Sequence, residues 1–181
     1  MKSIAMKRPY VTALLSAAAS VFVISVALTA QDKSTARVPN GLGVSDFKGY
    51  EGWQAIAPSY TDHGTKVILG NPIMMKAYSE GIPANGKAVP DGAMIAKIEW
   101  TEKKDADSPY DVTVPDTLRS LSFMVKDSKR FADTGGWGFA KFTYEPEPNT
   151  LTPEGTGTAC GYACHSAVKG RDLVFTHYAS R

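Results

Sequence analysis

The residue types best suited to chemistry gather in one short segment near the C-terminus, residues 160–165, with the sequence CGYACH. In sites of the form Cys-x-x-Cys-His, two thiols add across the vinyl groups of a haem and the adjacent histidine supplies a nitrogen to the iron. Here three residues separate the cysteines, so one residue must be looped out, but the Cys164-His165 step is kept. The segment predicts one covalent haem c, attached at Cys160 and Cys164, with His165 as metal ligand.

Three other interpretations of the same cysteines stay open. Cys160 and Cys164 are close enough in sequence for a small disulfide, which would leave a haem-free secreted binding domain. A zinc site with His165 would need a further ligand, and the sequence has no second cysteine pair. A redox dithiol normally has two intervening residues on a thioredoxin-like βαβ frame, which the sequence pattern does not indicate.

Composition limits the classes of protein that come into question. The chain has 181 residues and a mass of 19.4 kDa, which suits a leader and one ordinary domain. Hydrophobic residues make up 43% and charged residues 21%, typical of a globular protein. The net charge of +2 indicates no nucleic-acid partner, because that function needs a clustered basic surface.

Residues 1–30 have the pattern of an export signal. A basic start with Lys2, Lys7 and Arg8 precedes an uncharged apolar stretch over residues 11–28, and cleavage is expected after Ala27 or Ala30. The alternative is an uncleaved N-terminal anchor, which would be the only contact with a membrane. Both interpretations place the mature chain outside the cytoplasm, in the periplasm.

The mature chain divides into a polar linker over residues 31–46 and one domain over residues 47–181. Asn71 and Pro72 are suited to begin a short helix, which Gly81 can end. Residues 103–115 and 145–157 are expected to be loops. Short apolar, β-branched or aromatic runs predict strands over residues 67–69, 93–100, 118–126, 137–144 and 173–176. The fold class expected is mostly β (α+β): an antiparallel sheet with a few short helices.

Three stretches together resemble the cytochrome P-460 family, exported c-type haem proteins that include hydroxylamine-oxidising enzymes. They are VKDSKRFA with GWGF (residues 125–132 and 136–139), Cys164-His165 with DLVFT (residues 172–176), and DGAMIAK (residues 91–97). The resemblance runs from about residue 50 to residue 178. It implies an antiparallel β fold, one haem c with His165 on its proximal side and an open distal side, and a homodimer.

The resemblance also implies a function. The leading hypothesis is oxidation of hydroxylamine towards nitrous oxide or nitric oxide at a five-coordinate haem, with a redox partner protein accepting the electrons. The first alternative is a non-enzymatic protein that binds nitric oxide or carbon monoxide, like the cytochrome c′-beta branch. The second is a simple electron-transfer cytochrome, which would need a sixth iron ligand.

Two further residues are candidates for the site. Lys97 lies on one face of a half-buried strand, where lysines are usually solvated. The resemblance assigns to Lys97 the position that is cross-linked to the porphyrin in the hydroxylamine-oxidising members, so Lys97 favours the enzyme. Arg130 is suited to pair with haem propionates, or else to lie in a solvated turn. The remaining sulfur and imidazole groups are expected to be packing, surface or structural residues: Met74, Met75, Met94, Met124, His63 and His177.

Overall fold

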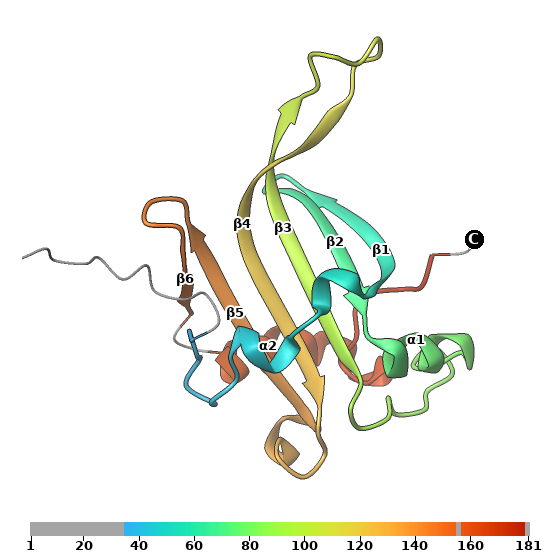
Figure 1. The fold of residues 1–181 in the computed structure, drawn as a ribbon. Coiled ribbons are helices and arrows are strands. Elements are labelled where there is room, and N and C mark those ends of the chain that lie inside the picture. The colour runs from blue at the N-terminus through green and yellow to red at the C-terminus, as the bar shows by residue number, and fades with distance from the viewer. Residues whose placement is uncertain (1–34, 155–156, 180–181) are drawn as a thin grey trace, which may run out of the picture.

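Six strands form one antiparallel sheet in which each strand pairs with the next along the chain (Figure 1). The computed structural model describes residues 35–154 and 157–179, with backbone alone for residues 157–160. The strands are β1 (Gln54–Thr61), β2 (Gly64–Gly70), β3 (Met94–Lys104), β4 (Thr113–Lys126), β5 (Trp137–Glu145) and β6 (Thr150–Pro153). This architecture confirms the mostly β, antiparallel fold class. The predicted leader, residues 1–30, lies outside the described residues.

Short helices lie beside the lower half of the sheet in Figure 1. The α-helices are α1 (Pro72–Ser79) and α2 (Gly157–His165), and the 3₁₀ helices are η1 (Val44–Phe47), η2 (Tyr50–Gly52), η3 (Ala132–Thr134) and η4 (Ser166–Arg171). The predicted start of α1 is confirmed, because the Asn71 side chain accepts a hydrogen bond from the Met74 amide at 3.0 Å and Pro72 opens the first turn. Gly81, with φ of 78°, follows the helix as expected.

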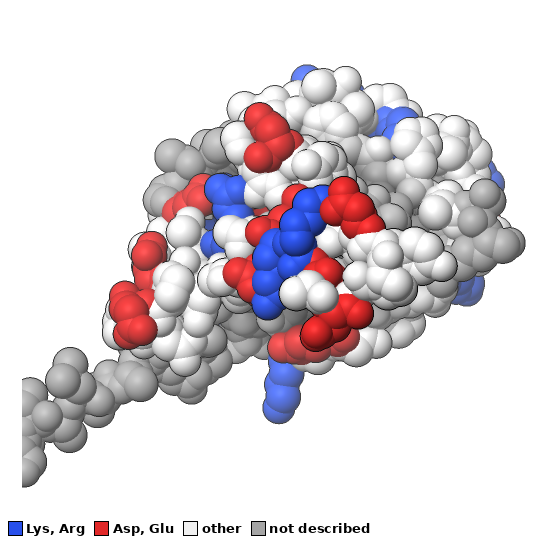
Figure 2. All heavy atoms as spheres, turned by 90° about the horizontal axis from the view of Figure 1, so that it is seen from above, with Lys and Arg blue, Asp and Glu red and all other residues white. Residues whose placement is uncertain are grey.

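The hairpin between β3 and β4 is longer than the sequence indicates. Residues 103–115 were expected to be a loop, but β3 continues to Lys104 and β4 begins at Thr113, which pair with each other. Ion pairs support this ribbon, since Lys104 Nζ lies 2.6 Å from the Asp111 carboxylate. Figure 2, which looks down from the top of Figure 1, shows basic and acidic side chains side by side on this face. Paired charges thus replace the apolar alternation that usually reveals a strand.

Two strands were missed and one was wrongly expected. β1 contains Pro58, which is tolerated because β1 is an edge strand, and β6 lies inside the expected loop over residues 145–157. The strand expected over residues 173–176 is wrong, since this segment is irregular. Its start is turned by Asp172 and Leu173, whose φ values of 47° and 64° are left-handed and incompatible with an extended strand.

Side chains alternate between two covered faces of the sheet. One face carries Ile68, Ile95 and Met124, which pack with α1 and with residues 173–174. The opposite face packs against residues 36–47, where Phe47 stacks on Phe123 with ring centroids 4.3 Å apart. Residues 35–46, which composition indicated as part of a linker, therefore belong to the folded unit, because their few apolar side chains are buried: Ala36, Val38 and Leu42. Within the described residues, no helix is long and apolar enough to cross a membrane.

Candidate functional site

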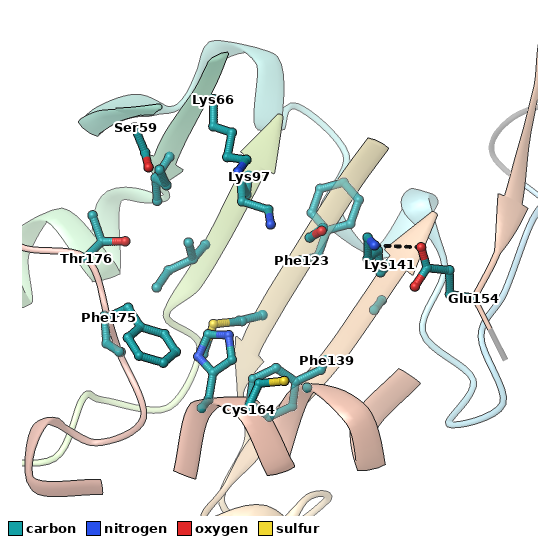
Figure 3. A pocket seen from close by; sticks show the side chains of 18 residues that line it. Ser59, Lys66, Lys97, Phe123, Phe139, Lys141, Glu154, Cys164, Phe175 and Thr176 are labelled. Carbon is teal, nitrogen blue, oxygen red and sulfur yellow. Dashed lines mark ion pairs between the residues drawn. The ribbon is translucent and has the colours of Figure 1, made fainter. Parts of the chain in front are cut away.

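A cavity of about 480 Å³ lies between one face of the sheet, the end of α2 and the C-terminal segment (Figure 3). It is lined by Ser59, Lys66, Ile68, Ile95, Lys97, Ser122, Phe123, Met124, Phe139, Ala140, Lys141, Glu154, Gly161, Cys164, His165, Val174, Phe175 and Thr176. Three residues singled out by the sequence, Lys97, Cys164 and His165, thus line a single enclosure. Lys97 is far along the chain from Cys164 and His165, which are neighbours.

His165 ends α2, and its ring is held between two aromatic rings. The ring centroids of Phe139 and Phe175 lie 5.0 Å and 4.9 Å from that of His165. Nδ1 of His165 lies 2.7 Å from the carbonyl oxygen of Leu173. A carbonyl can only accept, so Nδ1 carries the proton and Nε2 keeps its lone pair for a metal.

Burial holds the pKa of His165 below its ordinary value. The hydrogen bond to Leu173 raises this pKa and the charge of Lys97 lowers it, but burial is the largest effect. The imidazole is therefore neutral at neutral pH, and neutral imidazole is the form that coordinates iron.

The close approach of α2 to the sheet depends on Gly161. A Cβ atom at this position would lie 2.5 Å from Cγ of Phe139 on β5, so the helix can pack this tightly only with glycine.

Cys164 is a free, exposed cysteine that lines the cavity. Cys160 lies one turn earlier in α2, and its side chain is outside the described residues, so thioether formation at both positions stays a prediction.

The sheet presents a row of side chains to the cavity. Strand register places Ile68, Lys97, Ser122 and Lys141 next to one another across β2 to β5. Lys97 is therefore half-buried, with 36% of its side chain exposed, and its amine points into the cavity (Figure 3). Burial is the main reason that its pKa is lowered, so the neutral amine is favoured more than in an ordinary lysine.

Glu99 is a member of the site's surroundings that the sequence did not single out. Its carboxylate is 12% exposed and lies 3.8 Å from Lys97 Nζ, 3.9 Å from Lys66 Nζ and 3.8 Å from Arg119 Nη1. Period-two alternation places Glu99 on the same strand face as Lys97, and that pattern could have revealed it. A nearly buried carboxylate beside the cavity is suited to accept protons.

The cavity fits a haem c in its donor set and in its walls. Cys164 and His165 offer the thiol and the neutral imidazole that such a group requires, and Phe139 and Phe175 provide apolar surface. Phe175 packs on His165 but is still 46% exposed, so a bound macrocycle would cover more of its surface. The Ser122 hydroxyl is buried and has no hydrogen-bond partner among the described residues, which suits a polar group or a water within the cavity.

Arg130 does not join this site, contrary to the expectation that it would pair with propionates. Its guanidinium donates to the Asn40 carbonyl at 3.2 Å and lies 4.9 Å from the Phe131 ring centroid. It lines a separate hollow with Leu42 and Val125, whose side chains belong to the other face of the sheet. The lysines that line the cavity itself are Lys66, Lys97 and Lys141.

The other sulfur and imidazole groups are mostly placed as expected. Met124 lines the cavity, and Met74, a residue of α1, is fully buried. His177 Nε2 lies 2.7 Å from Arg171 Nη1, and His63 is exposed beside Asp62. Of the three histidines, His165 is thus the one that lines the cavity.

Comparison with known proteins identifies the family. No curated protein matches the sequence. The sequence model of the family described as Cytochrome P460 matches residues 47–176, which include the whole sheet, Lys97, both cysteines and His165. Proteins of this family bind haem c with iron and are generally exported. The chain therefore belongs to the cytochrome P460 family and is a c-type haem protein.

Proposed function

We propose that this c-type haem protein oxidises hydroxylamine, and that His165 is the iron ligand and Lys97 the residue that adapts the haem to this reaction. The observation that carries the proposal is that Lys97 and His165 line one cavity. A protein that only stored a gas or carried electrons would not need a partly desolvated amine at this place.

The chain's residues would hold the cofactor in defined ways. Nε2 of His165 would bind the iron, while the Leu173 carbonyl fixes the ring through Nδ1. Cys164, with Cys160, would form the thioether bonds. Phe139 and Phe175 would exclude water from the apolar part of the cavity. The bound haem c supplies the iron that takes up electrons from the substrate.

Proton removal is the task that falls to the protein. Two hydroxylamine molecules that form nitrous oxide and water release four protons and four electrons. We assign proton acceptance to Glu99, which is nearly buried beside Lys97. Glu154, the carboxylate among the described lining residues, is 38% exposed and paired with Lys141 at 2.7 Å. The electrons would leave to a redox partner protein.

Lys97 would act through a covalent bond to the porphyrin. A bond from Nζ to a ring carbon replaces one N–H bond and one C–H bond. The two protons and two electrons released would reduce a peroxide to water. The lowered pKa of Lys97, caused mainly by burial, supports this role because only the neutral amine has a free electron pair. Ring distortion by such a bond is one way in which a protein changes haem reactivity.

The test is turnover of hydroxylamine by purified holoprotein with an artificial electron acceptor, with nitrous oxide and nitric oxide measured as products. We expect Glu99→Gln to lower the rate at least tenfold, as the loss of a general base does. Lys104→Met, far out on the β3–β4 ribbon, is the control and should turn over normally. Holoprotein that binds nitric oxide but oxidises no hydroxylamine would contradict the proposal and favour the gas-binding alternative.

Three further features belong to this proposal. We infer that residues 1–30 direct export to the periplasm, that a redox partner docks near the cavity, and that the protein is a homodimer. The family match supports export, since its members generally are exported proteins. Mass spectrometry of the mature N-terminus and light scattering of the holoprotein test the first and the last of these inferences.

A further inference from the structure

We propose that the ion pair between Lys126 and Asp172 is a positioning device for the haem ligand, acting on His165 through the backbone of Leu173. The inference rests on His165 being the iron ligand, as proposed above. Neither Lys126 nor Asp172 lines the cavity, so both would act on the haem ligand indirectly, through other residues.

The pair is nearly buried and closely matched in geometry. Lys126 Nζ lies 2.8 Å and 2.9 Å from the two carboxylate oxygens of Asp172, and it also donates to the Gly135 carbonyl at 2.9 Å. The side chains are 7% and 17% exposed. The Asp172 carboxylate accepts a further hydrogen bond from the Val89 amide at 2.7 Å. The carboxylate is thus held by the end of β4 and by the loop before β3.

The backbone at this point is unusual. Asp172 and Leu173 are consecutive residues with left-handed φ values of 47° and 64°, a conformation that residues with a side chain rarely adopt. Leu173 is buried, and its amide donates to the Val168 carbonyl at 3.2 Å. This double turn brings the carbonyl oxygen of Leu173 to 2.7 Å from Nδ1 of His165. An anchored Asp172 side chain keeps the chain in this turn.

The consequence concerns the metal ligand. A firm hydrogen bond from Nδ1 to a carbonyl raises the basicity of Nε2, which strengthens the iron–histidine bond and favours ferric iron. If the Asp172 anchor is lost, the segment can relax towards ordinary backbone angles and the Leu173 carbonyl moves away from the ring. The iron–histidine bond then weakens, even though no residue that touches the haem has changed.

The experiment uses full-length holoprotein and two variants, Asp172→Asn and the double variant Lys126→Met with Asp172→Asn. Asparagine tolerates left-handed backbone angles in both variants. The single variant leaves the Lys126 charge buried without Asp172, whereas the double variant leaves no unpaired buried charge and should fold. We measure the iron–histidine stretching frequency of the ferrous protein by resonance Raman spectroscopy, and the midpoint potential. Both variants should show a lower frequency and a higher potential, with the larger shift in the double variant.

Two controls separate positioning from general stability. Leu151→Ala removes a buried side chain on the opposite face of the sheet and should lower stability without moving the frequency. Lys126→Arg keeps the positive charge beside Asp172, so its iron–histidine stretching frequency should stay close to that of the wild type. An unchanged frequency and potential in both test variants, with the band present in the wild type, would overturn the positioning role alone. The absence of any iron–histidine band in the wild type would overturn this inference together with the assignment of His165.

Discussion

Lys97 on β3 and His165 at the end of α2 line the same cavity, one from the sheet and the other from the helix. Burial is the largest cause of the lowered pKa of both residues. For His165 the charge of Lys97 lowers the pKa further. The enclosure thus shifts both groups towards the neutral form, which is the form in which imidazole binds iron and an amine forms a covalent bond.

Replacing Lys97 by leucine should separate haem attachment from haem modification. The wild-type Lys97 peptide should be joined to the haem peptide that contains residues 160–165, as peptide mapping and intact mass will show. Lys97→Leu should keep the haem, give the spectrum of an ordinary five-coordinate haem c, and abolish hydroxylamine oxidation. Lys141→Leu, in the same row of the sheet, is the matched control and should keep the cross-link. A free Lys97 peptide in fully loaded wild-type protein would refute the cross-link.

Haem should stay with the protein after acid–acetone extraction, because thioether bonds survive that treatment. Cys164→Ala should release the haem or prevent maturation, since Cys164 is the described thiol of the cavity. The absorbance of the extracted pellet measures this outcome. Ferrous wild-type protein should also bind carbon monoxide. A colourless protein from a host competent in cytochrome c maturation would contradict covalent attachment.

Gly161→Ala should destabilise the protein although alanine is the better helix former. The new Cβ would lie 2.5 Å from Cγ of Phe139, so α2 must move away from β5. We expect the free energy of unfolding to fall by about 1–3 kcal/mol, measured by urea denaturation. Gly170→Ala is the control, because its Cβ would meet no atom within 4 Å, and its stability should be unchanged or slightly higher. Equal stability losses in the two variants would show that the contact with Phe139 is not the cause.

Tyr78→Phe should weaken the attachment of the C-terminal segment and flatten the alkaline stability profile. The Tyr78 hydroxyl donates to the Thr176 carbonyl at 2.8 Å, a bond worth about 1 kcal/mol. Burial, opposed by the charge of Arg171, raises the pKa of Tyr78 from 10.0 to about 12.

The pH dependence follows from that shift. The unfolded tyrosine loses its proton near pH 10 while the folded one keeps it, so this contribution is full below pH 10 and is lost as the pH rises to about 12. Urea denaturation across this range should show a smaller decline for Tyr78→Phe than for the wild type. Tyr110→Phe, at a side chain that is 78% exposed, should leave the profile unchanged.

Local patterns predicted those parts of the fold that local physics decides. The start of α1 followed from Asn71 and Pro72, because capping needs only neighbouring residues. The irregular course of residues 173–176 could not be predicted from local patterns. Its apolar and β-branched residues suit a strand, but the left-handed turn at Asp172 depends on Lys126, which is distant in the sequence. The β3–β4 ribbon was missed because its strands carry ion pairs instead of alternating apolar residues.

For the candidate site, too, the sequence predicted what depends on neighbouring residues and missed what depends on distant ones. Cys164 and His165 are neighbours, so their spacing alone indicated their chemistry. Lys97 was placed by the family resemblance, since a lysine on a strand indicates solvent as readily as a site. Ser122 was not singled out, because its position beside Lys97 depends on how β3 pairs with β4. Glu99 shares a strand face with Lys97, but the alternation does not show what covers that face of the sheet. Arg130 was expected to pair with haem propionates or to lie in a solvated turn, and it lines another hollow than Lys97 and His165.

The alternation of side chains along β3 has a consequence for how such a protein can diversify. Ala96 is packed in the core on one face of the sheet, while Lys97 reaches the cavity on the other. Substitutions in the row that holds Lys97, Ser122 and Lys141 therefore alter the reactive environment without disturbing the packing against residues 36–47. The two faces can accumulate mutations almost independently. The reactivity of the cavity can therefore change while the packing that stabilises the fold is kept.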